Sequence, residues 1–315
     1  MNKGLEIPRV YINEKENYME TNKIGFIGLG IMGKPMAKNL IKAGYQLVIY
    51  DIKEENLAQF RALGAECAAN PGEVAEKVNV VITMVPNSPH VRAVCLGEKG
   101  IVSKAHKGLV VIDMSSIDPT ESRAIYKELI TYGIELLDCP VSGGEPKAID
   151  GTLSVMCGGN KEIWDKYVGL LKNMADSVVY VGPIGSGNVA KLANQMIVAA
   201  NISACAEAFT FAKKAGTDPE LVYQAIRGGL AGSAVMDAKV PMMFAGNYNP
   251  GFRIDLHTKD LTNALNAAHA INMPVPMTAQ MMEVMLELKN HGEGSYDHDD
   301  IVRYYERMSG TSIVK

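Results

Sequence analysis

Length, composition and charge limit the classes of protein to which this chain can belong. Its 315 residues are too many for one ordinary core and suggest two domains. Hydrophobic residues make up 47% and charged residues 21%, the balance of a packed protein rather than a disordered one. The net charge of −4 provides no basic surface for nucleic acid.

The cysteines and the termini bear on compartment and processing. The five cysteines form no C-x-x-C pair, which favours free thiols in the cytoplasm over disulfides or a zinc site. The six histidines show no ligand spacing, so no metal is expected. The longest uncharged stretch, residues 261–282, contains Asn, His, Pro and Gln and is not expected to span a membrane. Residues 1–22 form a polar extension without a secretory apolar run.

Short apolar runs alternate with helical segments over the first half of the chain. The helices expected first cover residues 33–42 and 54–63. Alternating strands and helices predict a doubly wound, Rossmann-type α/β sheet over residues 23–184. The expected strands are residues 24–27, 46–50, 78–84, 109–114, 134–137, 153–157 and 178–181.

The second half is predicted to be helical throughout. No Gly or Pro interrupts residues 188–215, which favours one long helix. Further helices are expected at residues 219–227, 256–271, 278–288 and 299–308. We therefore expect an all-α domain over residues 185–315, beginning in the Gly-Pro-rich segment 182–187.

A glycine-rich turn between the first strand and the first helix predicts a phosphate-binding loop. Gly28 permits a tight turn, Gly30 lets the backbone approach a pyrophosphate, and Gly33 lets helix and strand pack closely. The helix N-terminus then faces the phosphates. The G-x-G-x-x-G pattern consists of Gly28, Leu29, Gly30, Ile31, Met32 and Gly33.

Further residues are expected around a dinucleotide. Asp51 ends the second strand 21 residues after Gly30, where a carboxylate accepts hydrogen bonds from the adenosine ribose. A carboxylate there favours NAD(H), while nearby Lys53 leaves NADP(H) possible. Met84, Val85 and Pro86 end a strand at the ligand-binding edge of the sheet and could line the nicotinamide ribose. Pro86 could equally be an ordinary strand-to-loop proline.

The neighbouring strands end in residues suited to a small anionic substrate. Ser116 follows one strand, and Ser142 precedes Gly143 and Gly144, whose exposed amides suit a carboxylate. Either serine could instead be a helix cap.

Lys191 is the sharpest catalytic candidate. Asn194 and Gln195 follow at helical spacing, so three polar groups share one face of an apolar helix. Burial lowers the pKa of a lysine and makes it a usable acid or base. A surface lysine at a helix end is the alternative. Lys259 and Asp260, on a later helix, are weaker candidates because such a pair usually lies on a solvated face.

Four signatures give the chain a clear resemblance to the β-hydroxyacid dehydrogenase family. They are residues 25–33, 138–144, 187–195 and 259–261. The resemblance implies an NAD(P)-dependent oxidoreductase acting on the CH–OH group of a small hydroxy acid or on its semialdehyde, with the active site between the two domains. Residues 86–91, 142–156 and 223–233 resemble one branch of the family and favour a short semialdehyde.

The resemblance also implies roles for individual residues. Lys191 becomes the general acid/base, Ser116 also approaches the cofactor, and Lys259 reaches the cofactor from the helical domain. Many relatives carry Asn where this chain has Gln195, so its role is open. The resemblance implies that the all-α domain, residues 185–315, serves substrate binding and oligomerisation, and that the protein is a homodimer or homotetramer. A non-catalytic dinucleotide sensor with the same fold is the remote alternative. The implied substrate-binding residues are Ser116, Ser142, Gly143, Gly144, Asn194 and Gln195.

Overall fold

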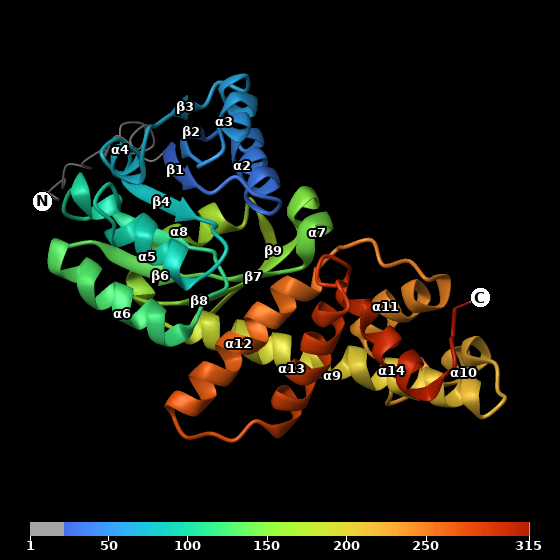
Figure 1. Cartoon of the computed structure of the whole chain (residues 1–315). Coiled ribbons are helices and arrows are strands. Elements are labelled where there is room, and N and C mark those ends of the chain that lie inside the picture. Colours follow the sequence, from blue (N-terminus) through green and yellow to red (C-terminus); the bar gives the residue numbers. More distant parts are fainter. Residues whose placement is uncertain (1–21, 315) are drawn as a thin grey trace, which may run out of the picture.

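The structure, a computed structural model, describes residues 22–314 (Figure 1). It consists of an N-terminal Rossmann-like domain, in which helices cover a β-sheet, and a C-terminal helical domain. Nearly all of the expected polar extension lies outside the described residues.

The sheet is mixed rather than wholly parallel. Its order is β3-β2-β1-β4-β5-β6-β8-β7, with β9 pairing with β8. The strands from β3 to β6 are parallel, whereas β8 runs antiparallel to β6 and β7. The doubly wound arrangement expected from the sequence is therefore present from β3 to β6, whereas no sequence pattern indicated the short strands β3 and β7. The strands are β1 (Lys23–Ile27), β2 (Gln46–Tyr50), β3 (Glu66–Cys67), β4 (Val80–Thr83), β5 (Val110–Asp113), β6 (Glu135–Asp138), β7 (Val141–Ser142), β8 (Leu153–Gly158) and β9 (Ala175–Gly182).

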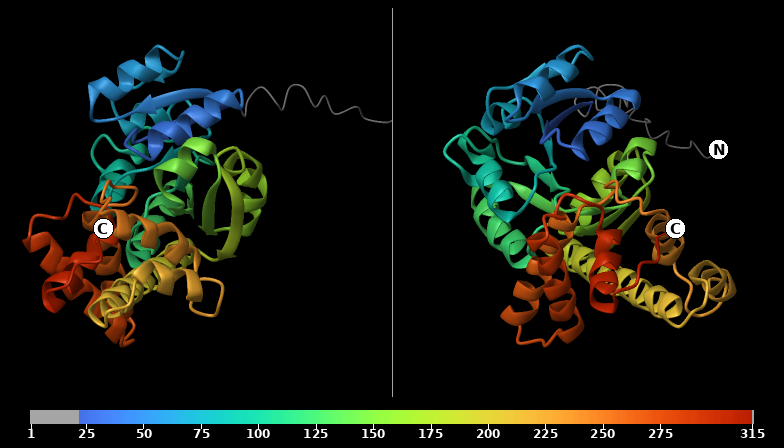
Figure 2. Two further views of the ribbon diagram at one scale, coloured as in Figure 1. Left: turned by 90° about the vertical axis from the view of Figure 1, so that its right-hand side faces the viewer. Right: turned by 45° about the vertical axis from the view of Figure 1, so that its right-hand side comes forward.

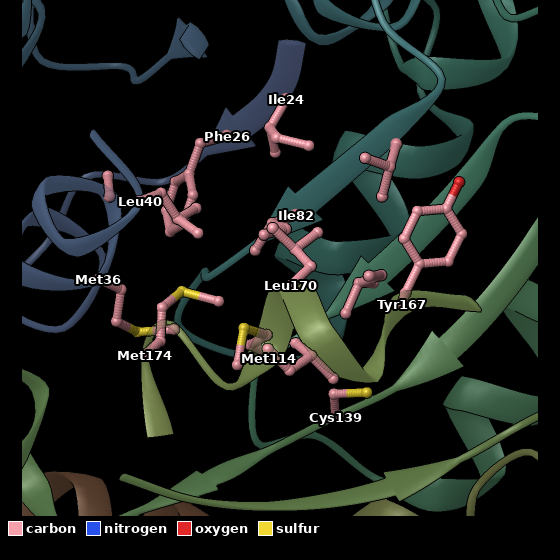
Figure 3. Close-up of a cluster of buried hydrophobic side chains, with 14 of the residues drawn as sticks. Ile24, Phe26, Met36, Leu40, Ile82, Met114, Cys139, Tyr167, Leu170 and Met174 are labelled. Carbon is pink, nitrogen blue, oxygen red and sulfur yellow. The ribbon is translucent and has the colours of Figure 1, made fainter. Parts of the chain in front are cut away.

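Helices cover both faces of the sheet, and each face has its own core. On one face, Met36 and Leu40 of α2 and Leu170 of α8 share one buried cluster with Phe26 and Ile82 of the strands (Figure 3). On the other face, side chains of α4, α5 and α6 pack over Val81 and Val111. The apolar strand runs follow from this burial on both sides. These helices are α2 (Gly33–Lys42), α3 (Glu54–Arg61), α4 (Pro71–Ala75), α5 (Ser88–Leu96), α6 (Pro119–Leu129), α7 (Gly144–Asp150) and α8 (Lys161–Leu171).

The C-terminal domain is built around the long helix α9. It begins beneath the sheet and runs the length of the helical part (Figures 1 and 2). α11 was not expected from the sequence; Pro241 lies inside it. The helices are α9 (Ser186–Lys214), α10 (Pro219–Ile226), α11 (Ala234–Ala245), α12 (Ile254–Ala270), α13 (Pro276–Asn290) and α14 (Ile301–Ser309).

The start of α9 is fixed to the sheet by Asp138, the last residue of β6. Its carboxylate accepts hydrogen bonds from the amides of Gly185 (2.7 Å) and Asn188 (2.8 Å). A Cβ on Gly187 would lie 2.2 Å from the Asp138 carbonyl oxygen, so only glycine permits this approach. Burial raises the pKa of Asp138 to about 7. This contact sets the position of Lys191, one turn further along.

α9 also has the length and apolar composition of a membrane-spanning helix. Half of its most apolar window is buried within the protein. It contacts β8 and all five other C-terminal helices, α10 to α14. These contacts are those of a central packing helix.

Candidate active site

The phosphate loop has the shape that a pyrophosphate needs. Gly28 has a φ of +95°, and a Cβ there would lie 2.3 Å from the carbonyl oxygen of Met84. A Cβ on Gly33 would lie 1.9 Å from the Gly28 carbonyl oxygen. By contrast, nothing lies within 4 Å of a Cβ placed on Gly30. The loop is therefore closed around its turn and open at the glycine expected to face the phosphates.

Asp51 ties the end of β2 to this loop. Its Oδ2 accepts a hydrogen bond from the Leu29 amide at 2.6 Å. Its Oδ1 accepts from the Lys53 amide (2.8 Å) and from Asn56 Nδ2 (3.1 Å). Carboxylate oxygens have further lone pairs, so the position fits a ribose. The loop, the start of α2 and Asp51 thus fit a dinucleotide.

Lys259 spans the gap between the two domains. Its ammonium donates hydrogen bonds to the carbonyl oxygens of Ser116 (2.7 Å) and Pro86 (3.1 Å), at the ends of β5 and β4. One helical turn on, Asn263 Nδ2 donates to Asn87 Oδ1 at 3.3 Å. α12 is thereby joined to the edge of the sheet at which Met84, Val85 and Pro86 were expected to meet a cofactor.

Lys191 is buried, with only 5% of its surface exposed. Burial, the largest influence, lowers its pKa to about 8, and the Asp260 carboxylate partly opposes this shift. Its Nζ lies 3.1 Å from Gln195 Oε1 and 5.9 Å from the ring centre of Phe252. The alternative of a surface lysine is therefore wrong. Near neutral pH the group carries a proton that it can release.

Gln195 links the lysine to a buried carboxylate. Its Oε1 also accepts a hydrogen bond from Asn194 Nδ2 at 2.9 Å, and its Nε2 donates to Asp260 Oδ2 at 2.7 Å. Asp260 is 1% exposed and lies 3.0 Å from Lys259 Nζ. The expectation of a solvated Lys259–Asp260 pair is therefore wrong for Asp260, which the helix pattern alone could not locate.

Three of the predicted anion-binding residues, Ser142, Gly143 and Gly144, lie at the turn between β7 and α7. Ser142 ends β7, and Gly143 and Gly144 follow with φ values of +131° and +69°. A Cβ on Gly144 would lie 3.5 Å from the Gly251 carbonyl oxygen, so this turn meets the segment before α12. Among residues 22–314, no hydrogen bond joins Ser116 or Ser142 to Lys191, and their binding roles stay predictions.

Sequence reasoning missed three residues around the lysine: Phe252, His257 and His298. They come from two segments separated by the length of α12 and α13, and no spacing pattern connects them. Within the described part of the chain, no group of three His, Cys, Asp or Glu side chains is arranged to hold a metal ion.

Comparisons with known proteins agree along the chain. Residues 23–182 match the NAD binding domain of 6-phosphogluconate dehydrogenase. Residues 185–305 match a domain described as the NAD-binding domain of NADP-dependent 3-hydroxyisobutyrate dehydrogenase. The chain is 41% identical to 2-hydroxy-3-oxopropionate reductase of Escherichia coli, over 92% of this chain and 99% of that protein. It is 36% identical to the mitochondrial 3-hydroxyisobutyrate dehydrogenase of Mus musculus, over 89% and 86% of the two chains.

Solved structures show the same architecture. The 3-hydroxyisobutyrate dehydrogenase of Mycobacterium tuberculosis, described with L-serine, superimposes with a TM-score of 0.84 at 28% identity, covering 90% of this chain and 98% of that one. The enzyme from Salmonella typhimurium gives 0.78 at 27% identity, covering 89% and 99%.

Together with this dinucleotide fold and helical domain, the matches and relatives identify the chain as an NAD(P)-dependent oxidoreductase acting on CH–OH groups. The chain belongs to the β-hydroxyacid dehydrogenase family, which includes 3-hydroxyisobutyrate dehydrogenase.

Proposed function

We propose that this protein is a 2-hydroxy-3-oxopropionate (tartronate semialdehyde) reductase, which interconverts the semialdehyde and D-glycerate with NAD(H). The observation that carries the proposal is Lys191, buried with a pKa of about 8 between the two domains. The 41% identity to the Escherichia coli reductase supports the choice of substrate.

Lys191 acts as the general acid in the direction of reduction. When bound, a reduced nicotinamide would supply the hydride for the aldehyde carbon. The Lys191 ammonium gives its proton to the aldehyde oxygen, which becomes the hydroxyl group of the product. Gln195 Oε1 accepts from the ammonium and so directs one of its three N–H bonds. In the oxidation direction the neutral amine takes the proton back.

Residues from both domains hold the substrate and the cofactor. Ser116, Ser142 and the amides of Gly143 and Gly144 bind the carboxylate, and Asn194 orients the substrate beside Lys191. The phosphate loop takes the pyrophosphate, and Asp51 disfavours a 2′-phosphate on the ribose, so NAD(H) is preferred over NADP(H). Lys259 holds the β4 and β5 ends in place against α12.

A panel of semialdehydes tests this assignment. kcat/KM for 2-hydroxy-3-oxopropionate, succinic semialdehyde and glyoxylate, and for the oxidation of 3-hydroxyisobutyrate, is measured with NADH or NADPH and their oxidised forms. We expect kcat/KM to be highest for 2-hydroxy-3-oxopropionate with NADH. A clear advantage for 3-hydroxyisobutyrate would move the protein to the activity of its 36% identical relative. NADH binding without turnover of any substrate would favour the alternative that the protein is a non-catalytic dinucleotide sensor.

We also propose that the protein is a homo-oligomer that pairs through α9. Val189, Ile197 and Phe211 of this helix are 47%, 62% and 72% exposed. The partly or fully exposed alanines between them lie at helical spacing, so one side of α9 is a mainly uncharged stripe, with exposed Glu207 at its edge between Ala204 and Phe211. The stripe consists of Val189, Ala193, Ile197, Ala200, Ala204, Ala208 and Phe211.

A further inference from the structure

Two buried histidines beside Lys191 have no part in the proposed proton transfer. His257 lies on α12 and His298 begins the 3₁₀ turn His298–Asp300, and both are almost fully buried. Their Nδ1 atoms are 2.9 Å apart, and their ring centres are 5.0 Å apart. Ionisable groups on every side face them: Lys191 on α9, Asp260 on α12, Lys239 on α11 and Asp297.

The hydrogen bonds of the pair assign its protons. The carbonyl oxygen of Gln195 can only accept, so His257 Nε2, 3.0 Å away, carries a proton and donates it. The pair is uncharged, because burial lowers the pKa of His257 and lowers that of His298 well below its ordinary value. His257 Nδ1 is therefore a lone pair, and His298 Nδ1–H donates to it.

This hydrogen-bonded pair supports Phe252. The Phe252 ring packs edge-on against His257 at 5.7 Å and His298 at 5.4 Å between ring centres. Its amide donates to Asp297 Oδ2 at 2.9 Å, and its carbonyl oxygen accepts from the His298 amide at 3.0 Å. The same ring lies over the Lys191 ammonium. Phe252 is thus fixed by the segment that carries His298.

The pair also ties α12 to α9. The Gln195 carbonyl oxygen that His257 contacts belongs to the residue whose side chain accepts from Lys191. The histidine pair therefore contacts both Phe252, whose ring lies over the Lys191 ammonium, and the turn of α9 that carries Gln195.

We propose that His257 and His298 are positioning residues for Lys191: their shared hydrogen bond holds Phe252 over the ammonium and fixes the Gln195 turn of α9. The inference rests on the proposed role of Lys191 as the proton donor. Loss of water is the main cause of the lowered pKa of Lys191, the charge of Asp260 opposes it, and the charge of Lys259 lowers the pKa further. Disrupting the pair lets water reach the ammonium and moves that pKa upward, towards its ordinary value.

The test is the pH profile of kcat for semialdehyde reduction in the full-length protein. His257→Phe keeps the ring and removes both hydrogen bonds, whereas His257→Gln keeps a donor that can reach the Gln195 carbonyl oxygen. For His257→Phe, kcat falls by about 10- to 100-fold, and the alkaline fall in rate moves to higher pH than in the unmodified protein. His257→Gln recovers part of both effects, and NADH binding is unchanged.

His269→Gln is the matched control, since His269 is exposed on the same helix, and it leaves the profile unchanged. If His257→Phe does not fold, His298→Asn gives the same readout, because it keeps an N–H at the Nδ1 position but removes one ring beneath Phe252. If the alkaline fall in kcat stays at the same pH in these variants, with or without a loss of rate, the inference is overturned. Normal turnover by Lys191→Ala would instead overturn the proposed function, so the two failures are distinct.

Discussion

Asp299 is a buried acid without a matching partner. It is fully buried in the turn that follows Asp297, and neither of its carboxyl oxygens has a hydrogen-bond partner within residues 22–314. Burial, followed by the charge of Asp297, raises its pKa to about 8. The folded protein therefore holds this acid protonated under conditions in which the unfolded chain would ionise it.

A pH dependence of stability follows from this shift. A raised folded-state pKa contributes stability that is complete below the ordinary pKa of 3.8 and is lost as the pH rises through about 8. Asp299→Asn, which cannot ionise, should melt a few degrees above the unmodified protein at about pH 9 and differ less at about pH 6. Thermal unfolding at both pH values measures this.

Asp176→Asn supplies the control for that comparison, because Asp176 is exposed on β9. It should leave both melting temperatures unchanged. An Asp299→Asn protein whose melting temperature follows the unmodified protein at both pH values would contradict the assigned protonation.

The sequence predicted site residues that form a local motif better than residues whose partners lie on other elements. Gly28, Gly30 and Gly33 carry a local pattern, because turn geometry depends on neighbours in the chain. Asp260 and His257 carry no such pattern, since their partners Gln195 and His298 lie on other elements. Their burial depends on how α12 packs against α9, which the helical periodicity of α12 does not specify.

At the scale of elements, periodicity located most strands and helices. β2 (Gln46–Tyr50) and α2 (Gly33–Lys42) have the bounds that the sequence predicted. The failures share a cause: β3 and β7 are too short for a pattern, and Pro241 masks α11, where tertiary packing outweighs the helix-breaking tendency of proline.

The exposed side of α9 leads to a prediction about assembly. Ile197→Glu places a charge in the middle of the stripe and should dissociate the oligomer, because an unpaired charge in an apolar interface is costly. Light scattering measures the mass of the unmodified protein and of the variant. Lys213→Glu, beyond the stripe at the end of the same helix, should leave the mass unchanged. A monomeric unmodified protein would refute the assembly through α9.

At the scale of the whole molecule, the two domains contribute different parts of the proposed site. The Rossmann-like domain supplies the phosphate loop, Asp51 and the strand ends, while α9 brings Lys191 from the helical domain. Asp138 fixes the start of α9 to the sheet, and Lys259 joins α12 to it. The proposed site therefore needs residues from both domains, and the buried Lys191 lies near the start of the helix that follows the sheet.

The most direct test of the account is the pH dependence of semialdehyde reduction in Lys191→Ala. In the unmodified protein, kcat should fall as the pH rises through about 8, where Lys191 loses its proton. The variant should bind NADH normally, lose about 10²- to 10⁴-fold in kcat and lose that pH dependence. Lys213→Ala should behave as the unmodified protein. Near-normal turnover by Lys191→Ala, or an unchanged alkaline fall in its rate, would contradict the account.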